Sequence, residues 1–163
     1  MSMIGILIRV TSDQLNSFIQ DSSLLEDYID SDEMQEHETK LDIHKYWDGI
    51  NFLLLNTETA DAIISKAIFS GQLIDEEQDL GYGPAQYLTA VQVKDISKAL
   101  SSIEDSYIKQ AFNAEKMNSK GVYLEPWSDN PQDVDDLMKY YKEVKDFYQK
   151  ASLNNQAVIT YIE

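Results

Sequence analysis

The pattern of apolar residues predicts three strands. The first covers residues 3–10, where β-branched and apolar side chains follow one another closely and indicate a central strand buried on both faces. Gly5 within it predicts a close backbone approach or a bulge. A short apolar segment near 84–89 is typical of an edge strand, and residues near 156–162 are apolar enough to pair with the first strand near the sheet centre.

The strongest helical pattern lies in residues 41–55. Its apolar stripe consists of Ile43, Trp47, Ile50 and Leu54. These positions repeat at i, i+4, i+7 and i+11, so we expect one buried helix over this range. His44, Asp48 and Asn51 form a polar stripe beside the first and place hydrogen-bonding groups next to the indole ring of Trp47.

Capping signals predict where other helices begin. The capping-box spacing occurs at Thr11 and Gln14, at Ser23 and Glu26, and at Thr89 and Gln92. Asn130 followed by Pro131 predicts the start of a long helix that ends near Asn154. Apolar periodicity also indicates a helix from Ala60 that Gly71 ends, and one from Tyr107 to Lys120. These elements predict a single α+β domain over residues 1–163, with helices packed on a small mixed or antiparallel sheet.

The composition and the N-terminal segment indicate the cellular compartment of the protein. The 163 residues include no cysteine, which excludes disulfides and thiolate metal or redox sites. The N-terminal segment lacks the basic region and cleavage site of a signal peptide, and no apolar run reaches the roughly 18 residues of a membrane span. We expect a cytoplasmic protein.

The net charge is −16, and it is unevenly placed. Residues 1–80 contain 17 acids and 4 bases, whereas residues 81–163 contain 12 acids and 9 bases. The only arginine is Arg9, so the chain has little with which to capture phosphate, and we expect neither nucleic acid nor anionic membrane as a partner. The acidity has two interpretations: solubility, or a surface that steers and binds a basic protein.

The second interpretation assigns the steering surface to two acidic segments, residues 26–38 and 75–79. Their acids are Glu26, Asp27, Asp30, Asp32, Glu33, Glu36, Glu38, Asp75, Glu76, Glu77 and Asp79. The first segment superficially resembles a calcium loop, but Gln35 and Leu41 stand where that loop requires glycine and an acid. We therefore expect no metal and no cofactor.

The sequence contains no catalytic motif. It has no nucleophile elbow, and the GYGP run that includes Gly81 and Gly83 is more simply a turn into a strand than a nucleotide-binding loop. His44 and Asp48 are one helical turn apart, yet a histidine beside an acid on a half-buried helix most often serves as a hydrogen-bonding residue. Aromatic residues in the glycine- and proline-marked connections could instead border a pocket. The candidate pocket residues are His44, Trp47, Asp48, Asn51, Tyr82, Tyr87, Tyr123 and Trp127.

The segment LDIHKYWDGINFLL resembles the signature helix of the YfbM-like family of bacterial proteins, a domain of unknown function. The opening MSMIG, the stretch GYGPAQYLTAVQVKDISKAL and the closing AVITYIE are also similar to that family. The resemblance implies a small α+β fold with helices on a short sheet, and it implies no reaction. Three positions depart from the family pattern: His44 often corresponds to aspartate, Asn51 to histidine and Gln86 to arginine.

Three functional hypotheses follow. The first is a non-enzymatic acidic module that binds a basic protein, in particular an immunity-type inhibitor of a basic toxin or nuclease. The second is a small-molecule binding or hydrolytic domain with a pocket around His44, Trp47 and Asn51. The third is a structural oligomer without ligand, and the sequence leaves the oligomeric state open.

Overall fold

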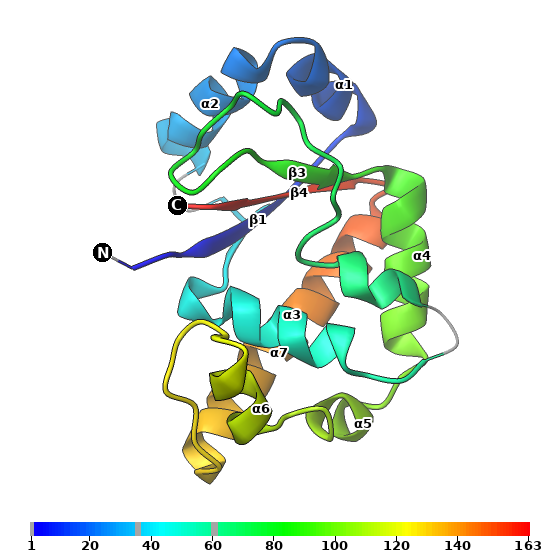
Figure 1. Ribbon diagram of the computed structural model, residues 1–163. Coiled ribbons are helices and arrows are strands. Elements are labelled where there is room, and N and C mark those ends of the chain that lie inside the picture. Colours follow the sequence, from blue (N-terminus) through cyan, green and yellow to red (C-terminus); the bar gives the residue numbers. More distant parts are fainter. Residues whose placement is uncertain (1, 35–36, 60–61) are drawn as a thin grey trace.

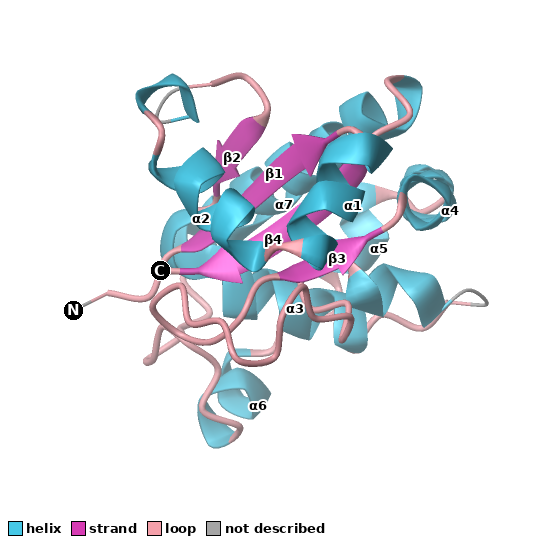
Figure 2. Ribbon diagram, turned by 90° about the horizontal axis from the view of Figure 1, so that it is seen from above, coloured by secondary structure: helices cyan, strands magenta, loops and turns pink. Residues whose placement is uncertain are grey.

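The computed structural model describes residues 2–34, 37–59 and 62–163. Its centre is a four-stranded antiparallel sheet in the order β2-β1-β4-β3 (Figures 1 and 2). The strands are β1 (Gly5–Val10), β2 (Lys40–Asp42), β3 (Gln86–Leu88) and β4 (Ala157–Ile162). The prediction that the first and last strands pair at the sheet centre is confirmed, with Leu7 opposite Thr160, and so is the edge position of β3.

Helices cover both faces of the sheet. In Figure 1, α1 (Ser12–Gln20) and α2 (Ser22–Asp30) lie on one face, and α3 (Trp47–Leu55), α4 (Ala90–Ser101) and α7 (Pro131–Leu153) lie on the other. Every residue of β1 and β4 is buried, because alternate side chains enter two apolar clusters. Ile6, Ile8 and Val10 pack beneath α1 and α2, whereas Leu7 packs against the helices of the opposite face. The α+β prediction is therefore confirmed.

The predicted helix over residues 41–55 is correct only from Trp47 onward. Residues 40–42 form β2, which pairs with β1, and His44–Tyr46 form a 3-10 turn, η2. Asp42 explains the break: its Oδ1 accepts the backbone N–H of His44 at 2.7 Å, and His44 has a φ of +52°. An aspartate that binds the backbone two residues ahead competes with helix formation.

Other helices are shorter than their apolar periods predict. The expected helix over 107–120 is two helices, α5 (Asp105–Lys109) and α6 (Ala114–Ser119), because the side chain of Asn113 caps a new start at α6. The chain after α3 forms a 3-10 helix, η3 (Ala62–Lys66), before Gly71 adopts the expected positive φ of 79°. Ala60, where we expected that helix to begin, lies outside the described residues. A further 3-10 turn, η1 (Asp32–Met34), follows α2.

The capping predictions hold at three helices and fail at one. Both capping boxes, at Thr11 and at Thr89, are formed, and Asn130 caps α7 with Pro131 at its first turn. Helix α2 begins earlier than predicted, because Asp21 rather than Ser23 is the N-cap and accepts the Ser23 N–H. Asp21 also ends α1, so the two helices adjoin without a linker.

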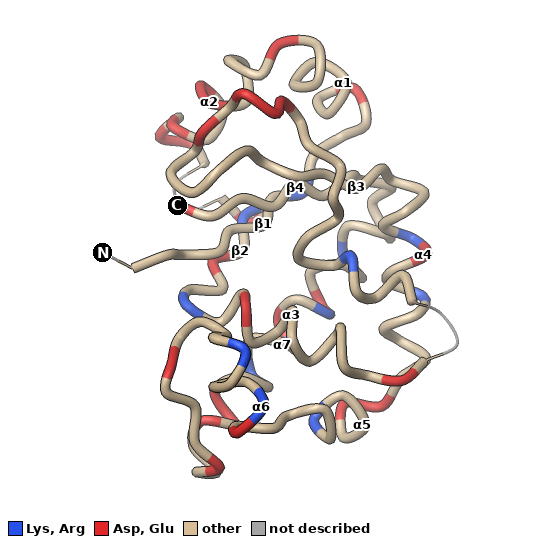
Figure 3. Tube along the Cα trace, in the orientation of Figure 1, with Lys and Arg blue, Asp and Glu red and all other residues tan. Residues whose placement is uncertain are grey.

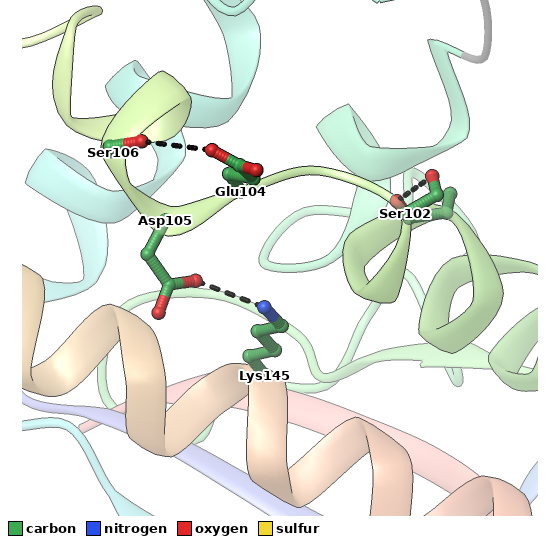
Figure 4. Close-up of polar contacts among 6 residues, drawn as sticks. Ser102, Glu104, Asp105, Ser106 and Lys145 are labelled. Atoms are coloured by element: carbon green, nitrogen blue, oxygen red, sulfur yellow. Dashed lines mark hydrogen bonds and ion pairs between the residues drawn. The ribbon is translucent and has the colours of Figure 1, made fainter.

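Close packing joins the strands and helices. A Cβ at Gly5 would lie 2.6 Å from Cβ of Trp47, which confirms the predicted close approach at that glycine. The indole N–H of Trp47 donates to the carbonyl of Met3 at 3.1 Å. Between two helices, Lys145 of α7 forms an ion pair with Asp105 at the start of α5 at 3.0 Å (Figure 4).

Candidate functional site

The two predicted acidic segments lie side by side. Figure 3 shows acids on α2 and on the loop before β3, above the same face of the sheet. Ser22 Oγ donates to Asp75 Oδ2 at 2.7 Å, and Gln78 Nε2 donates to the Ser22 carbonyl at 3.1 Å and to Glu26 Oε1 at 3.3 Å. Gln78 is buried, so these bonds attach the loop firmly to α2. We call this surface, formed by α2 and residues 75–79, the acidic face.

Hydrogen bonds keep two carboxylates of the acidic face ionised. Asp75 accepts from the Ser22 hydroxyl and from the Glu77 N–H, which lowers the pKa of its carboxyl. Asp79 Oδ1 accepts from the N–H groups of Gly81 and Gly83 at 2.9 and 3.1 Å, which lowers its pKa as well. Hydrogen bonds to the charged form favour that form, so both side chains remain anionic at neutral pH.

A hollow of about 260 Å³ lies within the acidic face. Its lining residues are Glu26, Ile29, Asp30, Asp79, Leu80, Tyr161 and Glu163. Four of these are acids and none is a base. Burial raises the pKa of the Tyr161 hydroxyl, and the charges of Glu163 and Asp30 raise it further. In the described part of the chain no three acidic or histidine side chains form a group that could hold a metal ion. Four acids and no base give the hollow a negative potential, which favours a cationic group over an anionic one.

The remaining predicted acids follow α2 along the chain. Asp32 and Glu33 lie in η1, and Glu38 precedes β2. All three are exposed. Glu36, also predicted to belong to this surface, lies outside the described residues.

Three of the eight candidate pocket residues, Trp47, Asp48 and Tyr123, meet where the segment between α6 and α7 contacts α3, and Trp127 lies in that segment with its ring beside Gly49 of α3. Trp47 stacks on Tyr123 with ring centroids 5.6 Å apart, and Asp48 Oδ2 accepts the Tyr123 N–H at 2.9 Å. The indole of Trp127 donates to the Val122 carbonyl at 2.9 Å. Burial raises the pKa of Asp48, against the lowering effect of the Tyr123 N–H. These contacts anchor the segment to α3.

The other four candidate pocket residues lie apart. His44 is exposed and packs edge-on against Tyr140 with ring centroids 5.4 Å apart, and Asn51 is half-buried on α3. Tyr82 is exposed, and Tyr87 of β3 packs on the cluster beneath α1 and α2. None of the eight candidates lines the hollow in the acidic face.

A second, larger hollow was not predicted from the sequence. It measures about 670 Å³, and its lining residues come from α1, α2, residues 31–34, His37, Thr39, Arg9 of β1 and Gln156. Arg9, Asp27 and Glu33 are among its lining residues. The only indication of this hollow in the sequence is Arg9, the single arginine. Composition shows that this residue is unusual, but it does not show where the residue lies in the fold.

Comparison with known proteins shows the family. The sequence matches the family described as "Domain of unknown function (DUF1877)" over residues 1–161. The fold is similar to the crystal structure of YfbM from Escherichia coli, a protein of unknown function, with a TM-score of 0.76 and 17% identity over 98% of this chain and 99% of that chain. No curated protein matches. No helix in the described residues is both long and apolar enough to cross a bilayer. From the match along almost its whole length, the chain belongs to the DUF1877 family.

Proposed function

We propose that the acidic face binds a basic protein, and that this chain acts as a non-enzymatic inhibitor of the immunity type for a basic toxin or nuclease. One observation carries the proposal: α2 and residues 75–79, about 50 positions apart in sequence, are bonded into one surface around a hollow lined by four acids and no base. Complementary charge raises association rates and selects partners. A lysine or arginine side chain of the partner fits the hollow.

The position of the acids in α2 supports a role beyond solubility. Asp27 and Asp30 lie in the last turn of this helix, where the partial negative charge of the helix dipole opposes them, and no base lies in that turn. An acid at this end of a helix costs about 0.3 to 1 kcal/mol. Acids that serve only for solubility could lie elsewhere on the surface, where they would not oppose a helix dipole. A cationic partner would offset it on binding.

A pull-down from the native host at moderate salt tests the proposal with three forms of the protein. The face variant carries E26Q, D30N, E76Q and E77Q, which leaves the hydrogen-bonded Asp75 and Asp79 intact. The control variant carries D95N, E115Q, D129N and D135N, all at exposed positions outside the acidic face. Both variants change the net charge by the same amount. Comparing them therefore distinguishes the effect of where the acids lie from the effect of the total net charge.

The wild type and the control variant are expected to retain the same basic protein, and the face variant is expected to lose it. The captured protein should then lose its toxic or nuclease activity when the wild-type chain is added in equal amount. Recovery of no basic protein by the wild type, or equal capture by all three forms, would contradict the proposal.

A further inference from the structure

The single arginine is buried, and no acid among the described residues forms an ion pair with it. Arg9 is 8% exposed. Its Nη1 donates to Gln156 Oε1 at 2.9 Å, and its Nη2 reaches the Glu38 carbonyl at the long distance of 3.5 Å. Its Nε is buried and has no hydrogen-bond partner among the described residues. Both partners of the guanidinium are neutral.

A buried charge is normally paired, because removing an ion from water is costly. Over residues 2–34, 37–59 and 62–163, no carboxylate forms an ion pair with Arg9. A guanidinium offers five N–H donors in a planar fork that matches a carboxylate. Arg9 therefore has unused capacity to bind an anionic group.

The cavity beside Arg9 also contains the opposite charge. Asp27 of α2 and Glu33 of η1 line the same hollow of about 670 Å³. Neither forms an ion pair with Arg9. Phe18 and Tyr28, whose ring centroids lie 5.4 Å apart, add an apolar wall. The volume is within the range of small-molecule sites.

We propose that this cavity binds a small zwitterion, with its carboxylate on Arg9 and its cationic group facing Asp27 and Glu33. A dianion such as phosphate fits less well, because two carboxylates and one guanidinium line the cavity. A basic amino acid has this combination of charges, and so does the C-terminal residue of a basic peptide. The proposal does not depend on the protein-binding role of the acidic face.

Isothermal titration with matched probes tests the charge pattern. L-arginine carries the carboxylate that agmatine lacks, and the tripeptide Gly-Gly-Arg represents a peptide C-terminus. We expect saturable binding of L-arginine, of the tripeptide or of both, and binding of agmatine at least about tenfold weaker, since one charge-assisted hydrogen-bond pair is absent. Tighter binding of the free amino acid or of the tripeptide identifies the source of the ligand.

Two variants locate the binding. R9Q removes the guanidinium, and S17W fills the cavity from an exposed position on α1. N16W places the same side chain at a neighbouring exposed position that does not line the cavity, and serves as the matched control. R9Q and S17W should each weaken L-arginine binding at least about tenfold, whereas N16W should leave it unchanged.

Circular dichroism establishes whether each variant is folded. If R9Q does not fold, S17W alone tests whether L-arginine binds in this cavity. Agmatine binding as tight as that of L-arginine would overturn the proposal. So would unchanged binding in folded S17W, or the absence of saturable binding for both L-arginine and the tripeptide at millimolar concentration.

Discussion

Two buried tyrosines on α7 provide a matched test of the packing between helices. Tyr148 and Tyr141 are both 0% exposed, and burial raises the pKa of both hydroxyls. The hydroxyl of Tyr148 donates to the carbonyl of Ala67, which joins α7 to the chain just after η3. The hydroxyl of Tyr141 has no hydrogen-bond partner among the described residues. The same substitution by phenylalanine should therefore have different effects at the two positions.

Y148F leaves the buried Ala67 carbonyl without its donor, so we expect a loss of about 1 to 3 kcal/mol in the free energy of unfolding. In a chain of this size each kcal/mol corresponds to roughly 2 to 4 °C, so the melting temperature should fall by about 2 to 12 °C. Y141F removes an unsatisfied polar group and keeps the ring, so we expect a change between zero and a gain of about 1 kcal/mol.

Urea denaturation followed by circular dichroism measures both free energies, and equal m-values show that the two variants unfold like the wild type. The two substitutions remove the same atom from helix α7, so differences in intrinsic helix propensity cancel. A loss in Y141F as large as that in Y148F would refute the assignment of the two hydroxyls.

Three further predictions concern the acidic face, the first strand and high pH. D30N should raise the free energy of unfolding by about 0.3 to 1 kcal/mol in urea denaturation, because the acid opposes the dipole of α2; a loss of stability would contradict this. G5A should lower it by about 1 to 3 kcal/mol, because the new methyl group would lie 2.6 Å from Cβ of Trp47; an unchanged melting temperature would show that the approach is looser. The pKa values of Tyr141, Tyr148 and Tyr161 are raised from 10.0 in the folded chain. Their contribution to the free energy of unfolding is therefore complete below about pH 10 and is lost as the pH rises further. The part of the tyrosinate absorbance that comes from these three side chains should appear together with the loss of circular dichroism as the chain unfolds, and ionisation of all tyrosines without unfolding would contradict this prediction.

The central strands and the capped helices could be predicted because their signals are local or depend on continuous apolar runs. The capping boxes at Thr11 and Thr89 require only residues three positions apart, and they form as predicted. The strand β2 could not be predicted in the same way. Its three residues continue into the apolar stripe of α3, and only the unpaired edge of β1 and the side chain of Asp42 determine that the helix begins later.

The site was predictable in composition but not in arrangement. The sequence identifies both acidic segments, yet their proximity depends on Ser22 and Gln78, two polar residues without a distinctive pattern. The prediction that His44, Asp48 and Asn51 form one polar stripe requires a continuous helix over residues 41–55. Because the helix begins at Trp47, His44 turns to Tyr140 and Asp48 binds the Tyr123 N–H.

One measurement tests the proposed role of the acidic face most directly: the rate at which the wild-type chain associates with the basic protein that it captures. Stopped-flow measurements over a range of salt concentrations should give a rate that falls steeply as salt rises, because screening weakens electrostatic steering. The face variant with E26Q, D30N, E76Q and E77Q should associate more slowly and with a flatter salt dependence, and the control variant should behave like the wild type. Equal rates and equal salt dependence for the face and control variants would contradict binding through the acidic face.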